Sequence, residues 1–227
     1  MNPIKKLAGQ TAIYGLSTIV GRFLNYLLVP LYVSFFKPQE YGVVTEFYAY
    51  VTFLNIILTY GMETSYFKFA QEQKGKEVFT TSFITLFTST TVFLSAVLLF
   101  RRDIATAMSY PDHVEYITWF ALILAFDTLS AIPFANLRIN NQPMKFSALK
   151  IFNVLINIFL NIFFIIICPL ILSINSDSFI SHVYNKEIGV GYIFISNLIA
   201  SVVTFLLFIV KLTFFIIIPS YHILNNA

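Results

Sequence analysis

The sequence predicts an all-α membrane protein with six transmembrane helices. Of its 227 residues, 58% are hydrophobic and only 11% are charged, whereas soluble domains carry about 25% charged residues. Six long apolar stretches fill most of the chain, and each is close to the roughly 20 residues that a helix needs to cross a bilayer. Spanning strands of a barrel are about 10 residues long and alternate in polarity. These stretches do neither, so we expect helices.

The predicted spans follow one another with short connections. They cover residues 11–36, 43–67, 79–100, 114–137, 148–172 and 190–218. The first stretch is too long for the apolar part of a signal peptide and has no small-residue cleavage site after it, so we expect an uncleaved first helix. Because the longest connections are only about 68–78, 101–113 and 173–189, residues 1–227 are expected to form a single six-helix membrane lobe.

Three prolines lie inside the predicted spans: Pro30 in the first, Pro133 in the fourth and Pro169 in the fifth. Proline removes a backbone hydrogen bond and clashes with the preceding turn. Pro30 and Pro133 are therefore expected to kink or break their helices.

The distribution of basic residues predicts the orientation. With a cytoplasmic N-terminus, four basic residues lie outside: Lys37, Arg101, Arg102 and Lys186. Nine lie on or near the cytoplasmic side: Lys5, Lys6, Lys68, Lys74, Lys76, Arg138, Lys145, Lys150 and Lys211. The positive-inside rule favours this arrangement, and six spans return the C-terminus to the cytoplasm. The net charge of +3 is spread over short loops, so no nucleic-acid partner is expected.

Arg22 lies near the middle of the first span, where an arginine costs about 2.5–3.5 kcal/mol to insert. Asn25 lies three residues later and shares its helix face. One interpretation is a substrate site in which Arg22 meets an anionic group. The other is a structural ion pair inside the bundle. Asp127, near the middle of the fourth span, is a candidate partner for Arg22 or a site for a proton or cation.

Asn153, Asn157 and Asn161 recur every four residues on the fifth span, so they form a polar stripe on one helix face. Asparagine is costly in lipid unless it is hydrogen-bonded. The stripe is therefore expected to face the interior, either as hydrogen bonds between helices or as part of a substrate path. Asn197, Ser201 and Thr204 form a weaker polar face on the sixth span.

The sequence offers no constellation for catalysis, for a metal or for a cofactor. Cys168 is the single cysteine, so no cysteine-based metal site is expected. The three histidines, His113, His182 and His222, lie in predicted loops or the tail. No zinc-protease motif and no phosphate-binding glycine loop occurs. We therefore expect a protein that is not an enzyme.

Four segments resemble bacterial polysaccharide flippases. They are Gly21–Tyr32 followed by Pro38–Gly42, Tyr60–Tyr66, the stripe Lys150–Asn161, and Gly189–Ser201. The segments are spread over nearly the whole chain and follow one another in the order that the flippase family has. The resemblance is to the Wzx-type (O-antigen flippase) branch of the MATE-like, or MOP, exporter superfamily.

This resemblance implies a function and a fold. Such proteins carry undecaprenyl-diphosphate-linked oligosaccharides across the bacterial inner membrane for the synthesis of polysaccharides such as lipopolysaccharide. Their two six-helix lobes surround a central cavity. The resemblance assigns Arg22 to binding of the diphosphate, and our candidate substrate-binding residues are Arg22, Asn25, Asp127, Asn153 and Asn157.

Family members have twelve or more helices, whereas six are predicted here. The chain is therefore expected to be the N-terminal half, as a truncated or half-length form that pairs with a second half or with itself. Two other functions remain open. One is a membrane partner of polysaccharide assembly that does not transport. The other is a MATE-type drug or cation antiporter, in which Asp127 would bind the coupling ion.

Overall fold

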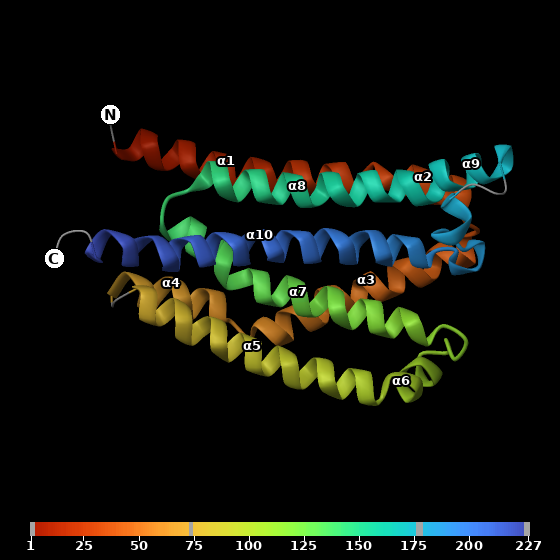
Figure 1. The fold of residues 1–227 in the computed structure, drawn as a ribbon, viewed down its shortest axis with the longest axis horizontal. Helices are drawn as coiled ribbons and strands as arrows, with labels where there is room; N and C mark the ends of the chain where they lie inside the picture. The colour runs from red at the N-terminus through yellow and green to blue at the C-terminus, as the bar shows by residue number, and fades with distance from the viewer. Residues whose placement is uncertain (1–2, 73–74, 176–178, 225–227) are drawn as a thin grey trace.

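The computed structural model describes residues 3–72, 75–175 and 179–224, and it is an all-helical bundle there (Figure 1). The helices are α1 (Pro3–Tyr26), α2 (Leu28–Phe35), α3 (Pro38–Thr59), α4 (Met62–Glu72), α5 (Gly75–Leu99), α6 (Arg101–Ala107), α7 (Val114–Ile139), α8 (Pro143–Ile162), α9 (Cys168–Ile174) and α10 (Gly191–Leu224). A π-helical turn, Phe163–Ile167, joins α8 to α9, and two 3₁₀ turns, Phe179–His182 and Lys186–Ile188, precede α10.

Six segments of the described chain are long and apolar enough to cross a membrane, which confirms the predicted fold class. They are Thr11–Phe35, Pro38–Glu72, Gly75–Leu99, Val114–Ile139, Pro143–Ile174 and Gly191–Ile209. The second and fifth begin five residues earlier than the apolar runs 43–67 and 148–172 predict. Pro38 and Pro143 explain this difference, because proline at the first position of a helix loses no hydrogen bond and has a suitable φ.

Three of these segments are interrupted along their length. Pro30 cannot donate a hydrogen bond to Tyr26, and α1 ends at Tyr26, which confirms the expected break. The second segment breaks at Tyr60 and Gly61, which both have positive φ, of 31° and 72°. In the fifth segment, the π-helical turn comes directly before Cys168 and Pro169. By contrast, Pro133 does not break α7, which continues past it to Ile139.

The apolar core forms around α7, which packs against α3, α4, α5 and α10. Phe47 of α3 is 1% exposed and lies at the centre of an aromatic cluster. Its ring contacts the rings of Tyr110, Tyr116, Phe120 and Phe194 at centroid distances of 5.4–6.2 Å. Such edge-on and tilted pairs fix helix positions in a membrane, where apolar burial alone does not distinguish protein from lipid.

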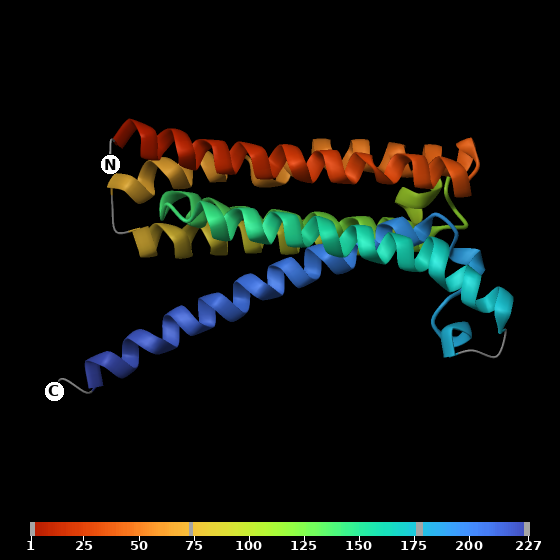
Figure 2. The same ribbon diagram turned by 90° about the horizontal axis from the view of Figure 1, so that it is seen from above.

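Both described ends of the chain lie at the same end of the bundle, as Figures 1 and 2 show. The α4–α5 and α7–α8 connections lie at that end too, while the α2–α3 connection, α6 and α9 lie at the other. This arrangement follows from an even number of crossings. The orientation was predicted from the positions of the basic residues. Of these, Lys74 and the side chains of Lys5, Lys6 and Lys211 lie outside the part of the chain that the structure describes.

Candidate functional site

The asparagine stripe of α8 is hydrogen-bonded to neighbouring helices. The Nδ2 group of Asn153 donates to Oγ1 of Thr204 on α10 at 2.9 Å. Asn157 donates to Oδ1 of Asn25 on α1 at 3.2 Å. Asn161 is fully buried and donates to the backbone and side-chain oxygens of Asn157. Each asparagine therefore faces protein.

The other face of α8 is apolar and exposed. Phe152, Leu155 and Phe159 repeat at helical spacing and are all exposed. This face suits lipid, so α8 separates a lipid face from a polar face that points into the bundle. The interior-facing stripe predicted from the sequence matches this geometry.

The polar face of α10 connects three helices. Asn197 donates to the Tyr48 hydroxyl of α3 at 2.8 Å. Ser201 donates to Oδ1 of Asp127 on α7 at 2.8 Å. One turn further along, Thr204 accepts from Asn153 of α8, as described above. Polar side chains at the centre of the bundle are thus linked from α3 and α7 through α10 to α8.

Asp127 does not pair with Arg22. Its carboxylate is half-buried and accepts from Ser201, and no ion pair between the two residues forms in the described structure. The reason is the packing, because α1 lies against α8, whereas Asp127 points toward α10. The ion pair considered from the sequence is therefore not formed.

Arg22 is exposed on α1, and its side chain makes no hydrogen bond or ion pair with any residue that the structure describes. Thr18, Arg22 and Asn25 share one face of the helix by their spacing, and all three are exposed. A second exposed face carries large apolar side chains: Leu16, Ile19, Phe23 and Tyr26. Gly21 and Ser17 form the buried face, and a Cβ atom at Gly21 would lie 3.5 Å from Cγ2 of Val154 on α8. The first helix thus has a lipid-compatible face and, beside it, a polar face with an unpaired cation.

Other cations near the bundle do have partners. Arg138, at the end of α7, donates to Oε1 of Glu63 at 2.6 Å and lies 5.0 Å from the Phe146 ring centroid. The Lys150 ammonium lies 4.3 Å from the centroid of Phe134. These contacts tie α4, α7 and α8 together at the end of the bundle that holds the termini.

The structure places the candidate residues in two groups. Asn25 and Asn157 contact each other directly, with Arg22 one turn away on α1. Asn153 and Asp127 both contact the polar face of α10. The sequence did not indicate the roles of Tyr48, which accepts from Asn197, or of Glu46, which accepts from the Tyr110 hydroxyl at 2.6 Å.

Among the described residues, no group of three or more histidine, cysteine or acidic side chains could hold a metal ion. Cys168 is buried and makes no disulfide. The arrangement instead offers a cation and several amides at membrane depth. A cation of this kind can bind an anionic group of a ligand, and the amides can bind hydroxyl groups of the same ligand close to that anionic group.

Comparison with known proteins gives one match. Residues 33–176, more than half of the chain, match the family described as polysaccharide biosynthesis protein. No curated protein and no solved structure matches the chain.

Proposed function

The chain belongs to the polysaccharide biosynthesis protein family, and from this premise we propose that it is a flippase. Its cargo would be an undecaprenyl-diphosphate-linked oligosaccharide, moved across the inner membrane of a bacterium with both termini in the cytoplasm. The family match and the membrane-spanning helices support a role for a multi-pass membrane protein in polysaccharide biosynthesis. The specific cargo and the movement are our proposal.

The unpaired Arg22 is the observation that carries this proposal. An arginine near mid-span is costly unless it meets water or an anion, and the described structure gives it no acidic partner. A guanidinium can form two parallel hydrogen bonds to a phosphate group. Arg22 would therefore attract the diphosphate, while Asn25 and Asn157 would offer amide groups beside it.

In this scheme the protein supplies binding and orientation and makes or breaks no bond. The half-buried Asn157 of α8 and the exposed Asn25 of α1 would offer amide groups to the polar head of the cargo, and the exposed apolar faces of α1 and α8 remain available to the polyprenyl chain in the bilayer. This division fits an amphipathic cargo, because its head must pass a polar surface while its tail stays in lipid.

We also propose that the working unit contains two six-helix bodies, either a second half or a second copy of this chain. Alternating access requires two bodies that rock around a shared site. The exposed polar face of α1 would then face the cavity between them.

The test is glycan export in cells in which the gene is replaced by variants. Arg22→Glu should reduce surface glycan about tenfold or more, because a hydrogen bond to a charged group contributes about 1.5–3 kcal/mol. Arg22→Lys should retain part of the export. Arg101→Glu, an exposed position at the start of α6, is the matched control and should leave export unchanged.

The alternatives predict different results at equal protein abundance. If deletion stops export but Arg22→Glu does not, the chain acts as a partner that does not transport. If neither change affects export and Asp127→Asn stops efflux of a cationic drug, the chain is a cation antiporter. Either result would overturn the flippase proposal.

A further inference from the structure

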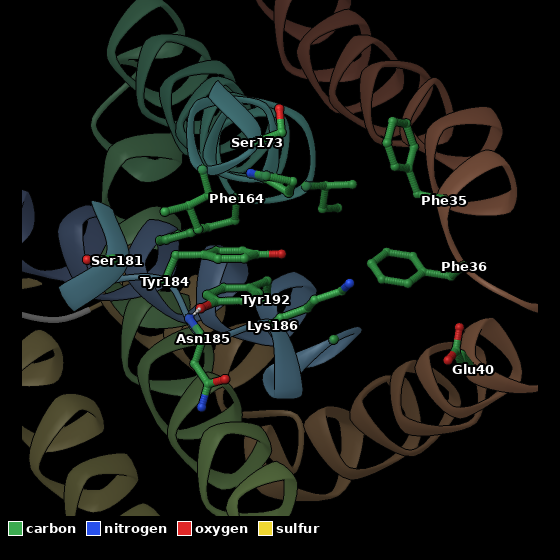
Figure 3. A pocket seen from close by; sticks show the side chains of 14 residues that line it. Phe35, Phe36, Glu40, Phe164, Ser173, Ser181, Tyr184, Asn185, Lys186 and Tyr192 are labelled. Atoms are coloured by element: carbon green, nitrogen blue, oxygen red, sulfur yellow. Dashed lines mark hydrogen bonds between the residues drawn. The ribbon is translucent and has the colours of Figure 1, made fainter. Parts of the chain in front are cut away.

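An open pocket of about 970 Å³ lies at the end of the bundle opposite the two termini. It is formed where α2 ends, where α3 begins, along the π-helical turn and α9, and by the 3₁₀ turns before α10 (Figure 3). Most of these segments lie at the ends of the membrane-spanning stretches or between them. A ligand here would therefore be at the membrane surface, where polar groups are favoured over acyl chains.

One wall of the pocket is a stack of three aromatic rings. Tyr184 and Tyr192 are nearly parallel, with ring centroids 4.9 Å apart and planes at 8°. Tyr192 stacks in turn on Phe164 at 4.6 Å and 19°. The Tyr192 hydroxyl accepts from the backbone N–H of Asn185 at 2.7 Å, which fixes the loop against the stack. The wall is held before any ligand binds, so little ordering is needed on binding.

The opposite wall is formed by Phe35 and Phe36 at the end of α2, and Figure 3 shows the Phe36 ring pointing toward the stack across the open space. Phe35 is exposed. Exposed phenylalanine rings on the wall of a pocket provide flat apolar surface for a ligand that has an apolar face of its own.

Polar groups converge on the same space. The Tyr184 hydroxyl points into the pocket (Figure 3) and has no partner among the described residues. Burial raises the pKa of Tyr184, so this hydroxyl remains a hydrogen-bond donor at neutral pH. The Lys186 ammonium also points into the pocket and forms no ion pair in the described structure. Across from it, Glu40 uses Oε2 to accept from the backbone N–H of Lys37 at 2.8 Å, and its Oε1 can accept from a ligand.

We propose that this pocket binds sugar rings. A pyranose has an apolar face of C–H groups and a rim of hydroxyls, and both features have counterparts here. Rings of Phe35 and Phe36 would cover the C–H face, and Tyr184, Lys186 and Glu40 would bind hydroxyls. The volume is at the upper end of the roughly 300–1,000 Å³ of small-molecule pockets, which allows more than one ring. That the sugar belongs to an exported glycan rests on the proposed function; binding of a sugar does not.

The test is saturation-transfer NMR on the full chain in lipid nanodiscs, with lactose and N,N′-diacetylchitobiose as probes and glycerol as a polyol without a ring. Saturation should reach the ring C–H protons of at least one disaccharide and should be absent for glycerol. Tyr184→Phe keeps the stacked ring and removes only the hydroxyl, so it should weaken binding about threefold to tenfold, the range for one hydrogen bond. Phe36→Ala should weaken it at least as much.

Tyr26→Phe is the matched control, because Tyr26 is exposed on α1 away from the pocket, and it should bind the disaccharide like the unmodified chain. Circular dichroism and gel filtration establish that each variant is folded. No saturation with either disaccharide, equal saturation with glycerol, or binding unaffected by Tyr184→Phe and Phe36→Ala would overturn the pocket assignment. If the pocket binds no sugar but export still depends on Arg22, the pocket assignment is wrong and the proposed function stands. If the pocket binds sugar but the chain exports no glycan, the pocket assignment stands and the proposed function is wrong.

Discussion

Polar residues in the centre of the bundle and in its first helix differ in burial and in hydrogen bonding. In the most apolar stretch of α7, 67% of the residues are buried, and its Asp127 accepts a hydrogen bond from Ser201. In the most apolar stretch of Thr11–Phe35, only 22% of the residues are buried, and Arg22 of this span is exposed without a partner in the described structure. Paired polar groups in the buried part can be explained by stability alone. Arg22 has no such partner, which is why the proposed function rests on α1 rather than on α7.

The largest expected effect concerns close packing at the start of α10. A Cβ atom at Gly191, the first residue of α10, would lie 2.8 Å from Cζ3 of Trp119 and 2.9 Å from Cγ2 of Ile188. Gly191→Ala should therefore destabilise the fold by about 1–3 kcal/mol through overpacking. The measurement is thermal unfolding in detergent, followed by the fluorescence of Trp119, the single tryptophan.

Gly15, on the exposed side of α1, has no heavy atom within 4 Å of such a Cβ. Gly15→Ala is the control and should leave the melting temperature unchanged or slightly higher, since alanine favours helix. If both substitutions lowered the melting temperature equally, Gly191 would not be more closely packed than Gly15, against the structure.

The second prediction concerns coupling between polar residues. Because Ser201 donates to Asp127, a double-mutant cycle of Ser201→Ala and Asp127→Ala should show a coupling free energy of about 0.6–2 kcal/mol. The same cycle with Arg22→Gln and Asp127→Asn should give a value near zero. Unfolding by SDS in mixed micelles measures both. Strong coupling in the second cycle would mean that Arg22 and Asp127 do pair, against the structure.

The third and smallest effect is on pH dependence at the end of the bundle opposite the termini. The hydrogen bond from Tyr110 to Glu46, together with burial, raises the pKa of Tyr110 from 10.0 to about 12. The folded state thus holds this proton more tightly than the unfolded state. Its contribution to stability is complete below pH 10 and is lost as the pH rises through about 12.

Tyr110→Phe should therefore make the loss of stability between pH 10 and 12 shallower, as measured by thermal unfolding at a series of pH values. Tyr60→Phe is the matched control, because Tyr60 is exposed and its hydroxyl makes no hydrogen bond in the described structure. An identical slope in Tyr110→Phe and the unmodified chain would show that the contact with Glu46 does not hold in solution.

The sequence was sufficient for the parts of the fold that depend on local chemistry. Long apolar runs predicted the six spans, and the missing N–H of Pro30 predicted the break between α1 and α2. The break at Tyr60 and Gly61 was not predicted, because a positive φ at a tyrosine has no reliable sequence signal. At Pro133, where a kink or a break was expected, α7 does not break and continues to Ile139.

For the site, the sequence predicted which residues are polar at depth but not which helices they join. The spacing of Asn153 and Asn157 predicted one interior face, yet their partners, Thr204 and Asn25, lie 51 and 132 residues away in the chain. Such pairs depend on which helices pack together. The aromatic pocket was missed for the same reason, because its stacked rings come from separate segments and Tyr192 by itself looks like an interfacial anchor.

The measurement that tests the central claim most directly is thiol labelling along α1 in native membranes. Single cysteines at Thr18, Arg22 and Asn25 sample the polar face, and cysteines at Ile19 and Phe23 sample the apolar face. Cys168 is buried and is replaced by alanine to remove background. With a membrane-impermeant maleimide, our account predicts that positions 18, 22 and 25 are labelled at least several times faster than 19 and 23. Equal protection of all five positions, or faster labelling at 19 and 23, would place Arg22 away from a water-filled path and contradict its proposed role.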